Sequence, residues 1–338
     1  MGKKISIRHI LIFILLLMAC CIPLVIKTPY LLSICITTFF IGSCSLSWSI
    51  LGGLTGQTSL GHAAFMALGA YISTLLLLYG NVSPWLSMII VFFLVGAIAA
   101  LLLSPCFVLR GPYFSLVTIA FGEAFRNLFL NWKFAGQGQG LTLPYGESSF
   151  ALIRFTSKVP YYYIAFAMLV VFYIVLRKID VSKLGYALKT IREDEDTANA
   201  IGINPLRYKA VATFISAGMI AVSGVFYACY IRYINPDILL SSASVQYVMP
   251  VIIGGIGSVT GPLIGAVILT PLSEYLNAAL SQIASGVNLV VYALIIILVI
   301  LYQPSGIMGW FTHSKIRRKI NRFLDKVDGK NKLDGEVK

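Results

Sequence analysis

Long apolar runs, separated by short polar segments, dominate the amino-acid sequence. The runs are too long and too uniformly apolar for strands or for an outer-membrane barrel. A helix needs roughly 20 mostly apolar residues to cross a bilayer. The pattern therefore predicts an all-α, polytopic transmembrane helical bundle of about eight to ten spans. The candidate spans lie near residues 9–26, 31–50, 60–79, 85–109, 112–130, 160–176, 210–231, 246–260, 263–283 and 287–303.

Glycine clusters interrupt this pattern at two places, Gly52–Gly56 and Gly254–Pro262. Glycine-rich breaks at membrane depth free backbone groups that only protein or a water-filled cavity can satisfy. The clusters therefore predict two broken helices, and their shared GGxxG-like texture is one that an internal repeat would produce. Close helix packing through small residues is the alternative. A count of eight spans follows if some segments only re-enter the membrane.

One long interior segment, Arg177–Lys209, departs from the apolar pattern. It contains Glu193, Asp194, Glu195 and Asp196 in succession, although the chain has 13 acidic residues among 338. A membrane protein that gathers its interior polarity in one segment presents that segment to something soluble. A solvated linker is the alternative interpretation.

Capping residues divide this segment into two predicted short helices. Ser182 suits the N-cap of the first helix. Three apolar residues of that helix share one face: Leu184, Leu188 and Ile191. A plain linker has no need of a capped helix with Ala and Gly at the spacing of Ala198 and Gly202, so the segment favours a docking element.

The second predicted helix begins at Asp194 and ends at Gly202, and Pro205 prevents its continuation into the next span. Acidic residues at a helix start also suit the helix dipole. The acidic run is therefore expected to start this helix and keep it in water. The small residues Ala198 and Gly202 are expected to contact a partner protein.

The composition and the placement of charge agree with a membrane protein. Hydrophobic residues make up 58% of the chain and charged residues 12%, with a formal net charge of +13. The basic residues flank spans instead of forming a nucleic-acid-binding module, so nucleic acid is not an expected partner. Those near the ends of the chain are Lys3, Lys4, Arg8, Arg317, Arg318, Lys319 and Arg322.

An even number of spans places both termini on one side, which the basic residues identify as cytoplasmic. The same rule makes 177–209 a cytoplasmic loop and 131–159 an external loop. We expect a transmembrane permease domain over 1–308. The basic segment 309–338 is expected to be a cytoplasmic tail, either an amphipathic helix on anionic lipid or a disordered tail.

Ionisable and polar residues within apolar runs are costly to bury and mark candidate functional positions. Glu123 and Arg126 are expected to form an ion pair at i and i+3. His62 suits either a hydrogen-bonded packing role or the pathway, and Glu274 suits a pathway, an interface or an inter-helix bond. The candidate substrate-pathway residues are Gln57, Ser59, His62, Tyr113 and Glu274.

Nothing in the sequence indicates covalent chemistry. There is no HExxH motif, no nucleophile elbow and no GxxxxGK[ST] loop, so we expect no catalytic residue, no metal and no cofactor in this chain. The cysteines show no paired CxxC spacing and are interpreted as small buried hydrophobes. They are Cys20, Cys21, Cys35, Cys44, Cys106 and Cys229.

Four segments together resemble a known family. Residues 196–202 (DTANAIG) resemble the EAA-xxx-G loop through which bacterial ABC importer permeases bind their ATPases, with Asp and Thr in place of Glu and the first Ala. The other segments are 56–65 (GQTSLGHAAF), 109–118 (LRGPYFSLVT) and 254–262 (GGIGSVTGP). In this order they resemble the LivM-type permease of branched-chain amino acid importers over roughly residues 30–305.

The resemblance implies a multi-pass subunit of the bacterial inner membrane that imports leucine, isoleucine and valine. It implies a LivH-type permease partner, two cytoplasmic ATPases that bind the ATP, and an extracytoplasmic binding protein. The ATPase-coupling residues implied by the loop are Glu193, Asp194, Glu195, Asp196, Thr197, Ala198 and Gly202.

Other functions remain open at this point. Related permeases carry urea and short amides, and the second permease is either a paralogue or another copy of this chain. A stand-alone channel or an ion-coupled secondary transporter is a different class, disfavoured by the EAA-like loop and by the few membrane carboxylates.

Overall fold

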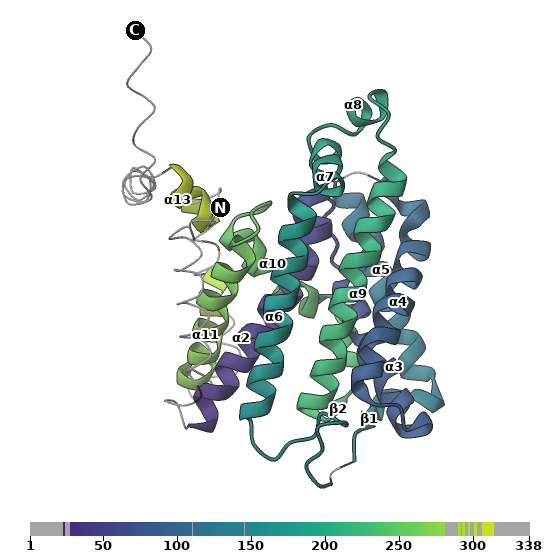
Figure 1. Cartoon of the computed structure of the whole chain (residues 1–338), viewed down its shortest axis with the longest axis vertical. Helices are drawn as coiled ribbons and strands as arrows, with labels where there is room; N and C mark the ends of the chain where they lie inside the picture. The colour runs from purple at the N-terminus through teal and green to yellow at the C-terminus, as the bar shows by residue number, and fades with distance from the viewer. Residues whose placement is uncertain are drawn as a thin grey trace, which may run out of the picture.

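The computed structural model describes residues 28–280 except Arg110 and Tyr145, together with Pro23 and the residues 290–291, 293–294, 297, 301–302 and 306–313. The predicted spans 9–26 and 287–303 lie wholly or largely outside the described residues, as does the basic tail from residue 314 onward. The helices form one upright bundle, drawn in Figure 1. Their bounds are α2 (Pro29–Trp48), η1 (Ser49–Gly53), α3 (His62–Gly80), α4 (Pro84–Leu103), η2 (Ser104–Val108), α5 (Pro112–Asn131), α6 (Val159–Asp180), α7 (Lys183–Glu193), α8 (Glu195–Ala200), α9 (Pro205–Ile231), α10 (Ser241–Gly254), α11 (Gly261–Leu280) and α13 (Gly306–His313).

The predicted all-α polytopic bundle is confirmed. Within the part of the chain that the structure describes, six helices are long and apolar enough to cross a membrane. They are Pro29–Gly53, His62–Gly80, Pro84–Val108, Val159–Asp180, Pro205–Ile231 and Gly261–Leu280. Helix α5 has 20 residues but is not among these six, and α10 has 14. Proline in the first turn starts several of the helices, because the first backbone N–H groups of a helix have no intrahelical partner.

Helix α9 lies at the centre of the bundle and packs against both α3 and α4. Glycines on both α3 and α9 allow this close approach of the two helices. A Cβ on Gly69 of α3 would lie under 3.0 Å from the Ala221 carbonyl of α9, and a Cβ on Gly224 of α9 equally close to the Met66 carbonyl of α3. Small residues commonly mediate helix packing in membrane proteins, because they let helix backbones touch. The hydrophobic effect adds little to helix association there, since lipid tails are also apolar.

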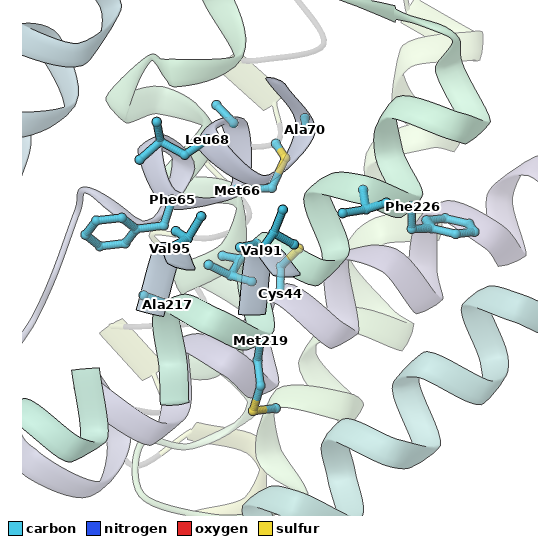
Figure 2. Close-up of a cluster of buried hydrophobic side chains, with 14 of the residues drawn as sticks. Cys44, Phe65, Met66, Leu68, Ala70, Val91, Val95, Ala217, Met219 and Phe226 are labelled. Atoms are coloured by element: carbon cyan, nitrogen blue, oxygen red, sulfur yellow. The ribbon is translucent and has the colours of Figure 1, made fainter. Parts of the chain in front are cut away.

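Large apolar side chains fill the space around these contacts. Figure 2 shows a cluster contributed by α2, α3, α4 and α9. Its labelled members are Cys44, Phe65, Met66, Leu68, Ala70, Val91, Val95, Ala217, Met219 and Phe226, all of them buried. The core therefore fixes α2, α3, α4 and α9 as one packed unit.

The first predicted break is displaced by one helical turn. Gly52 and Gly53 do not interrupt the helix, because they belong to the π-helical turn η1, where the Trp48 ring covers Gly52. The chain leaves the helical conformation at Gly56, with φ of +75°, and resumes it at His62. We call residues 56–61 the first break.

The second break confirms the prediction at Gly254–Pro262 and corrects the predicted span 246–260. Helix α10 begins earlier, at Ser241, and ends at Gly254. Residues 255–260 are not helical, and Gly255 and Gly257 have φ of +116° and +82°. We call residues 255–260 the second break. These conformations suit glycine because they are costly for residues with a Cβ.

The two long polar loops lie at opposite ends of the bundle, as predicted. Helices α7 and α8 protrude at the top of Figure 1, whereas β1 (Leu141–Thr142) and β2 (Tyr233–Ile234) lie at the bottom. The strands are antiparallel, with Leu141 opposite Ile234. Two short helices within the 131–159 loop precede β1, η3 (Lys133–Ala135) and η4 (Gln137–Gln139), and η5 (Pro236–Leu239) follows β2.

Candidate functional site

The α7–α8 pair has the local structure that its capping residues predict. The Ser182 hydroxyl accepts a hydrogen bond from the Gly185 N–H at 3.3 Å, and the Asp194 carboxylate accepts one from the Thr197 N–H at 2.6 Å. Gly202, with φ of +87°, follows the end of α8. The Asn204 side chain then caps α9 by accepting from the Arg207 N–H at 3.2 Å. Both predicted helices are confirmed.

The burial of α8 corrects one expectation. Ala198 has no exposed surface, because α8 packs this side against its neighbours α7 and α9. Its side chain therefore does not lie on the surface that a partner would meet. Large apolar side chains in and beside the α7–α8 pair are exposed instead, at Val181, Tyr186, Ile201 and Leu206. Exposed apolar side chains at a polar end of a molecule suit a protein interface.

The acidic run is not wholly solvated, which differs from the expectation that it lies in water. Glu195 turns inward, and its carboxylate accepts a hydrogen bond from the Lys209 ammonium at 2.8 Å. Lys209 is 2% exposed and also donates to the Phe107 carbonyl at 2.9 Å. A buried ammonium requires such partners because an unpaired charge is costly to desolvate. This ion pair ties α8 to α9 and η2.

A second cation joins the same segment to the breaks. Arg192, in the last turn of α7, donates from Nη1 to the Gly53 carbonyl at 2.8 Å. Its side chain also passes close to Gly56 and Gly257. A polar cavity of about 260 Å³ adjoins this contact, and its lining includes Gln57, Arg192 and Lys209. The α7–α8 pair, both breaks and the start of α9 therefore meet at one site.

Three of the predicted pathway residues lie together at the first break. The Ser216 hydroxyl donates to the Ser47 carbonyl at 2.6 Å and lies 2.9 Å from His62 Nε2, so Nε2 carries the proton. His62 Nδ1 then accepts from the Ser59 hydroxyl at 3.0 Å. The side chains of His62 and Ser59 are both buried in this network. His62 therefore has the hydrogen-bonded packing role that the sequence analysis considered. Gln57 is adjacent and donates to the Phe107 carbonyl at 3.5 Å.

The remaining pathway candidates lie elsewhere. Tyr113 is in the first turn of α5 and is 68% exposed. Glu274 is on α11, 13 residues beyond its start, and so about 20 Å along that helix from the second break. The structure therefore divides the predicted pathway set among three places, and a pathway role for each residue stays a prediction.

Helix α5 combines polar character with exposure. The predicted pair is present, with Arg126 Nη1 at 3.9 Å from Glu123, but Arg126 Nη2 makes a shorter contact of 3.0 Å with Asp237 of η5. One stripe of the helix is exposed at helical spacing, over Tyr113, Leu116, Ala120, Ala124, Asn127 and Asn131. Asparagine is unfavourable against lipid tails, so this stripe suits water or another protein.

Sequence reasoning missed Arg192, Lys209 and Ile201 as members of this site. From the sequence, Arg192 and Lys209 are only two basic residues of the polar segment 177–209, because their partners are distant in the sequence. Ile201 stands beside the Ala and Gly positions of the loop motif. The structure, and not the sequence, shows that its side chain is 66% exposed. Among the described residues, no three His, Cys, Asp or Glu side chains are grouped as a metal site would require.

The bundle of apolar helices, the two glycine breaks and the polar helix pair define a polytopic membrane protein. Residues 30–300 match the family described as branched-chain amino acid transport system / permease component, and the chain belongs to this family. The chain is therefore a multi-pass membrane protein of a permease family, as the resemblance implied.

The curated relatives carry the same description. The chain is 26% identical over 286 residues to the high-affinity branched-chain amino acid transport system permease protein LivM of Escherichia coli, covering 78% of this chain and 66% of that protein. It is 36% identical over 128 residues to LivH of the same organism, covering 38% and 40%, and 32% identical over 128 residues to BraD of Pseudomonas aeruginosa, also covering 38% and 40%. No solved structure matches the chain.

Proposed function

We propose that this chain is the permease subunit of an ATP-driven importer of branched-chain amino acids. The match over residues 30–300 carries this proposal. The chain spans 66% of the length of its LivM relative, so the substrate and the partners are inferred from the family. The default substrates are leucine, isoleucine and valine, and the host membrane is the bacterial inner membrane.

The proposed assembly contains a second permease, two ATPases and a binding protein. The likeness to both LivM and LivH supports pairing with a related LivH-type subunit in a pseudo-symmetric dimer. The sequence has no phosphate-binding GxxxxGK[ST] loop, so we assign ATP binding and hydrolysis to the partner ATPases. This chain then receives the motion that ATP binding produces.

We assign the α7–α8 end of the bundle to the cytoplasm, together with both termini. This end gathers the basic residues that favour the cytoplasmic side of a bilayer. They are Arg177, Lys178, Lys183, Lys189, Arg192, Arg207 and Lys209. The ATPases then dock on the exposed apolar residues around α8, and the binding protein meets the β1–β2 end.

The exposed stripe of α5 is the proposed wall of the translocation pathway, shared with the second permease. Its middle part presents Ala120 and Ala124, which leave room for an apolar side chain of a substrate. Asn127 and Asn131 at the β1–β2 end offer amide groups that can hydrogen-bond a zwitterion. An apolar passage with few fixed charges suits branched-chain amino acids.

Ile201→Glu tests the docking surface. Placing a charge on an apolar interface residue is expected to weaken ATPase binding by roughly thirtyfold, since a hot-spot contact is worth about 2 kcal/mol or more. The measurement is co-purification of the permease pair with its ATPases. Ile201→Leu is the matched control, because it keeps the apolar surface.

Size-exclusion chromatography of the Ile201→Glu chain must show the profile of the unsubstituted protein, which separates docking from folding. Full ATPase recovery together with normal amino-acid uptake in Ile201→Glu would refute the docking assignment.

A further inference from the structure

Arg192 occupies an unusual position between the polar helix pair and the membrane-spanning part. Its Nη1 donates to the Gly53 carbonyl at the end of η1, at 2.8 Å. Carbonyls in the last turn of a helix have no intrahelical partner, and a basic side chain near that end also suits the helix dipole. Arg192 therefore completes the end of the helix that precedes the first break.

Glycines make room for this side chain on more than one side. A Cβ on Gly257, in the second break, would lie under 3.0 Å from Arg192 Nη1, and one on Gly56 would lie 3.1 Å from Arg192 Cγ. Gly53 and Gly257 are themselves close, since a Cβ on Gly53 would lie 3.6 Å from the Gly257 nitrogen. One arginine side chain thus lies against both breaks, with its stem beside Gly56 and its guanidinium beside Gly257, although the breaks are about 200 residues apart in the sequence.

The other cation of this site has a different kind of partner. Lys209 bonds Glu195 of α8 and the Phe107 carbonyl of η2, at 2.8 and 2.9 Å. Its own helix, α9, forms the centre of the packed bundle. Lys209 therefore fastens α8 to the rigid scaffold, whereas Arg192 fastens the end of α7 to Gly53, three residues before the first break, and packs against Gly56 and Gly257 of the two breaks.

The surroundings of Arg192 allow movement. The polar cavity of about 260 Å³ beside it leaves room for the guanidinium to shift. Helix α3 begins directly after the first break and α11 directly after the second. Non-helical turns adjust their backbone angles at less cost than packed helices, so a displacement of Arg192 reaches α3 and α11 through the breaks.

We propose that Arg192 is the positioning residue that couples the α7–α8 pair to both glycine breaks. When the docked pair moves, Arg192 moves the Gly53 carbonyl through its hydrogen bond and shifts against the Gly257 backbone, and so changes the position of the first turns of α3 and α11. This inference rests on the proposed function for its role in transport. The contact between one side chain and both breaks is independent of it.

The first test uses the isolated chain in lipid nanodiscs and requires no transport. Arg192→Gln is expected to raise backbone hydrogen exchange in residues 53–58 and 255–258 by roughly tenfold, because the shared contact is lost. Arg207→Gln is the matched control, as it removes an exposed cation from the same polar segment. Unchanged exchange in both breaks would overturn the proposed tie, whether or not the chain transports amino acids.

The second test uses the complete transporter in proteoliposomes. Arg192→Gln is expected to keep the ATPases bound and ATP hydrolysis within about twofold of the unsubstituted protein, while leucine uptake per ATP falls roughly tenfold. Arg207→Gln is expected to leave this ratio unchanged. An unaltered ratio in Arg192→Gln would overturn the coupling role. A failure of the unsubstituted protein to transport leucine would instead contradict the proposed function.

Gly257→Ala provides a second variant in which Arg192 itself is intact. The new methyl group would displace the guanidinium, so uptake per ATP is expected to fall as in Arg192→Gln. Gly111→Ala is its control, because Gly111 also has a positive φ, +58°, and lines the same cavity, but an added Cβ there has no atom within 4 Å and does not displace Arg192. If leucine uptake per ATP is the same in Gly257→Ala and in Gly111→Ala, the breaks do not act through Arg192.

Discussion

Gly224→Ala is expected to destabilise the helical bundle strongly. The added methyl group would meet the Met66 carbonyl of α3 at well under 3.0 Å, with the Ala70 nitrogen at 2.9 Å. These are backbone atoms, so no flexible side chain can move aside and the two helices must separate. Overpacking of a core costs about 1–3 kcal/mol, and a backbone collision of this kind lies at or above the upper end of that range. Thermal unfolding of the purified chain in detergent measures the effect.

Gly122→Ala is the matched control for this prediction. Gly122 lies in the interior of α5, where the nearest atom to an added Cβ is the Leu239 carbonyl at 3.7 Å, an ordinary van der Waals contact. Alanine stabilises a helix interior by about 0.5–1 kcal/mol relative to glycine. The control is therefore expected to be neutral or stabilising. Equal melting temperatures for both variants would show that α3 and α9 are not in backbone contact.

Lys209→Met is expected to destabilise the protein by about 3–5 kcal/mol, the usual cost of removing one partner of a buried ion pair. Methionine keeps much of the apolar stem but removes the hydrogen bonds that the ammonium donates to the Glu195 carboxylate and to the Phe107 carbonyl. Glu195→Ala is expected to cost a similar amount, because it leaves the ammonium buried opposite no charge. Thermal unfolding of the purified variants measures both effects.

The double variant Lys209→Met with Glu195→Ala completes a double-mutant cycle. Residues in direct contact have interaction energies of about 0.5–3 kcal/mol, so the double variant is expected to lose less stability than the two single losses added. Strict additivity would contradict the ion pair. Lys183→Met with Glu193→Ala is a suitable reference, since both residues are exposed on α7.

Local chemistry explains what the sequence predicts well. The caps Ser182 and Asp194 act on N–H groups three residues away, so their role can be inferred from neighbouring residues alone. The apolar runs behave similarly, because crossing a bilayer imposes length and composition on each helix separately. The bundle class and the two helices of the polar segment follow from these signals.

Long-range contacts explain what the sequence does not reveal. Lys209 is buried because the Phe107 carbonyl, 102 residues away, and Glu195 both accept from it. Arg192 meets a carbonyl 139 residues distant. Each of these positions depends on how the helices pack.

Ala198 illustrates the same limit within the coupling segment. Its small size and its place in the loop motif suggested a partner contact, but smallness also suits close packing of α8 within the molecule. The neighbouring Ile201 takes the exposed position instead. The periodicity of a six-residue helix is too short to distinguish these two faces from the sequence.

The most direct measurement of the central claim is transport by the reconstituted complex. Proteoliposomes would contain this chain, a LivH-type permease and the two ATPases, with ATP enclosed and the binding protein with its labelled substrate supplied on the opposite side. We predict leucine uptake that requires both ATP and the binding protein, that isoleucine and valine compete with, and that urea does not replace. Uptake of urea without leucine, or leucine uptake by this chain alone under an ion gradient, would contradict the account.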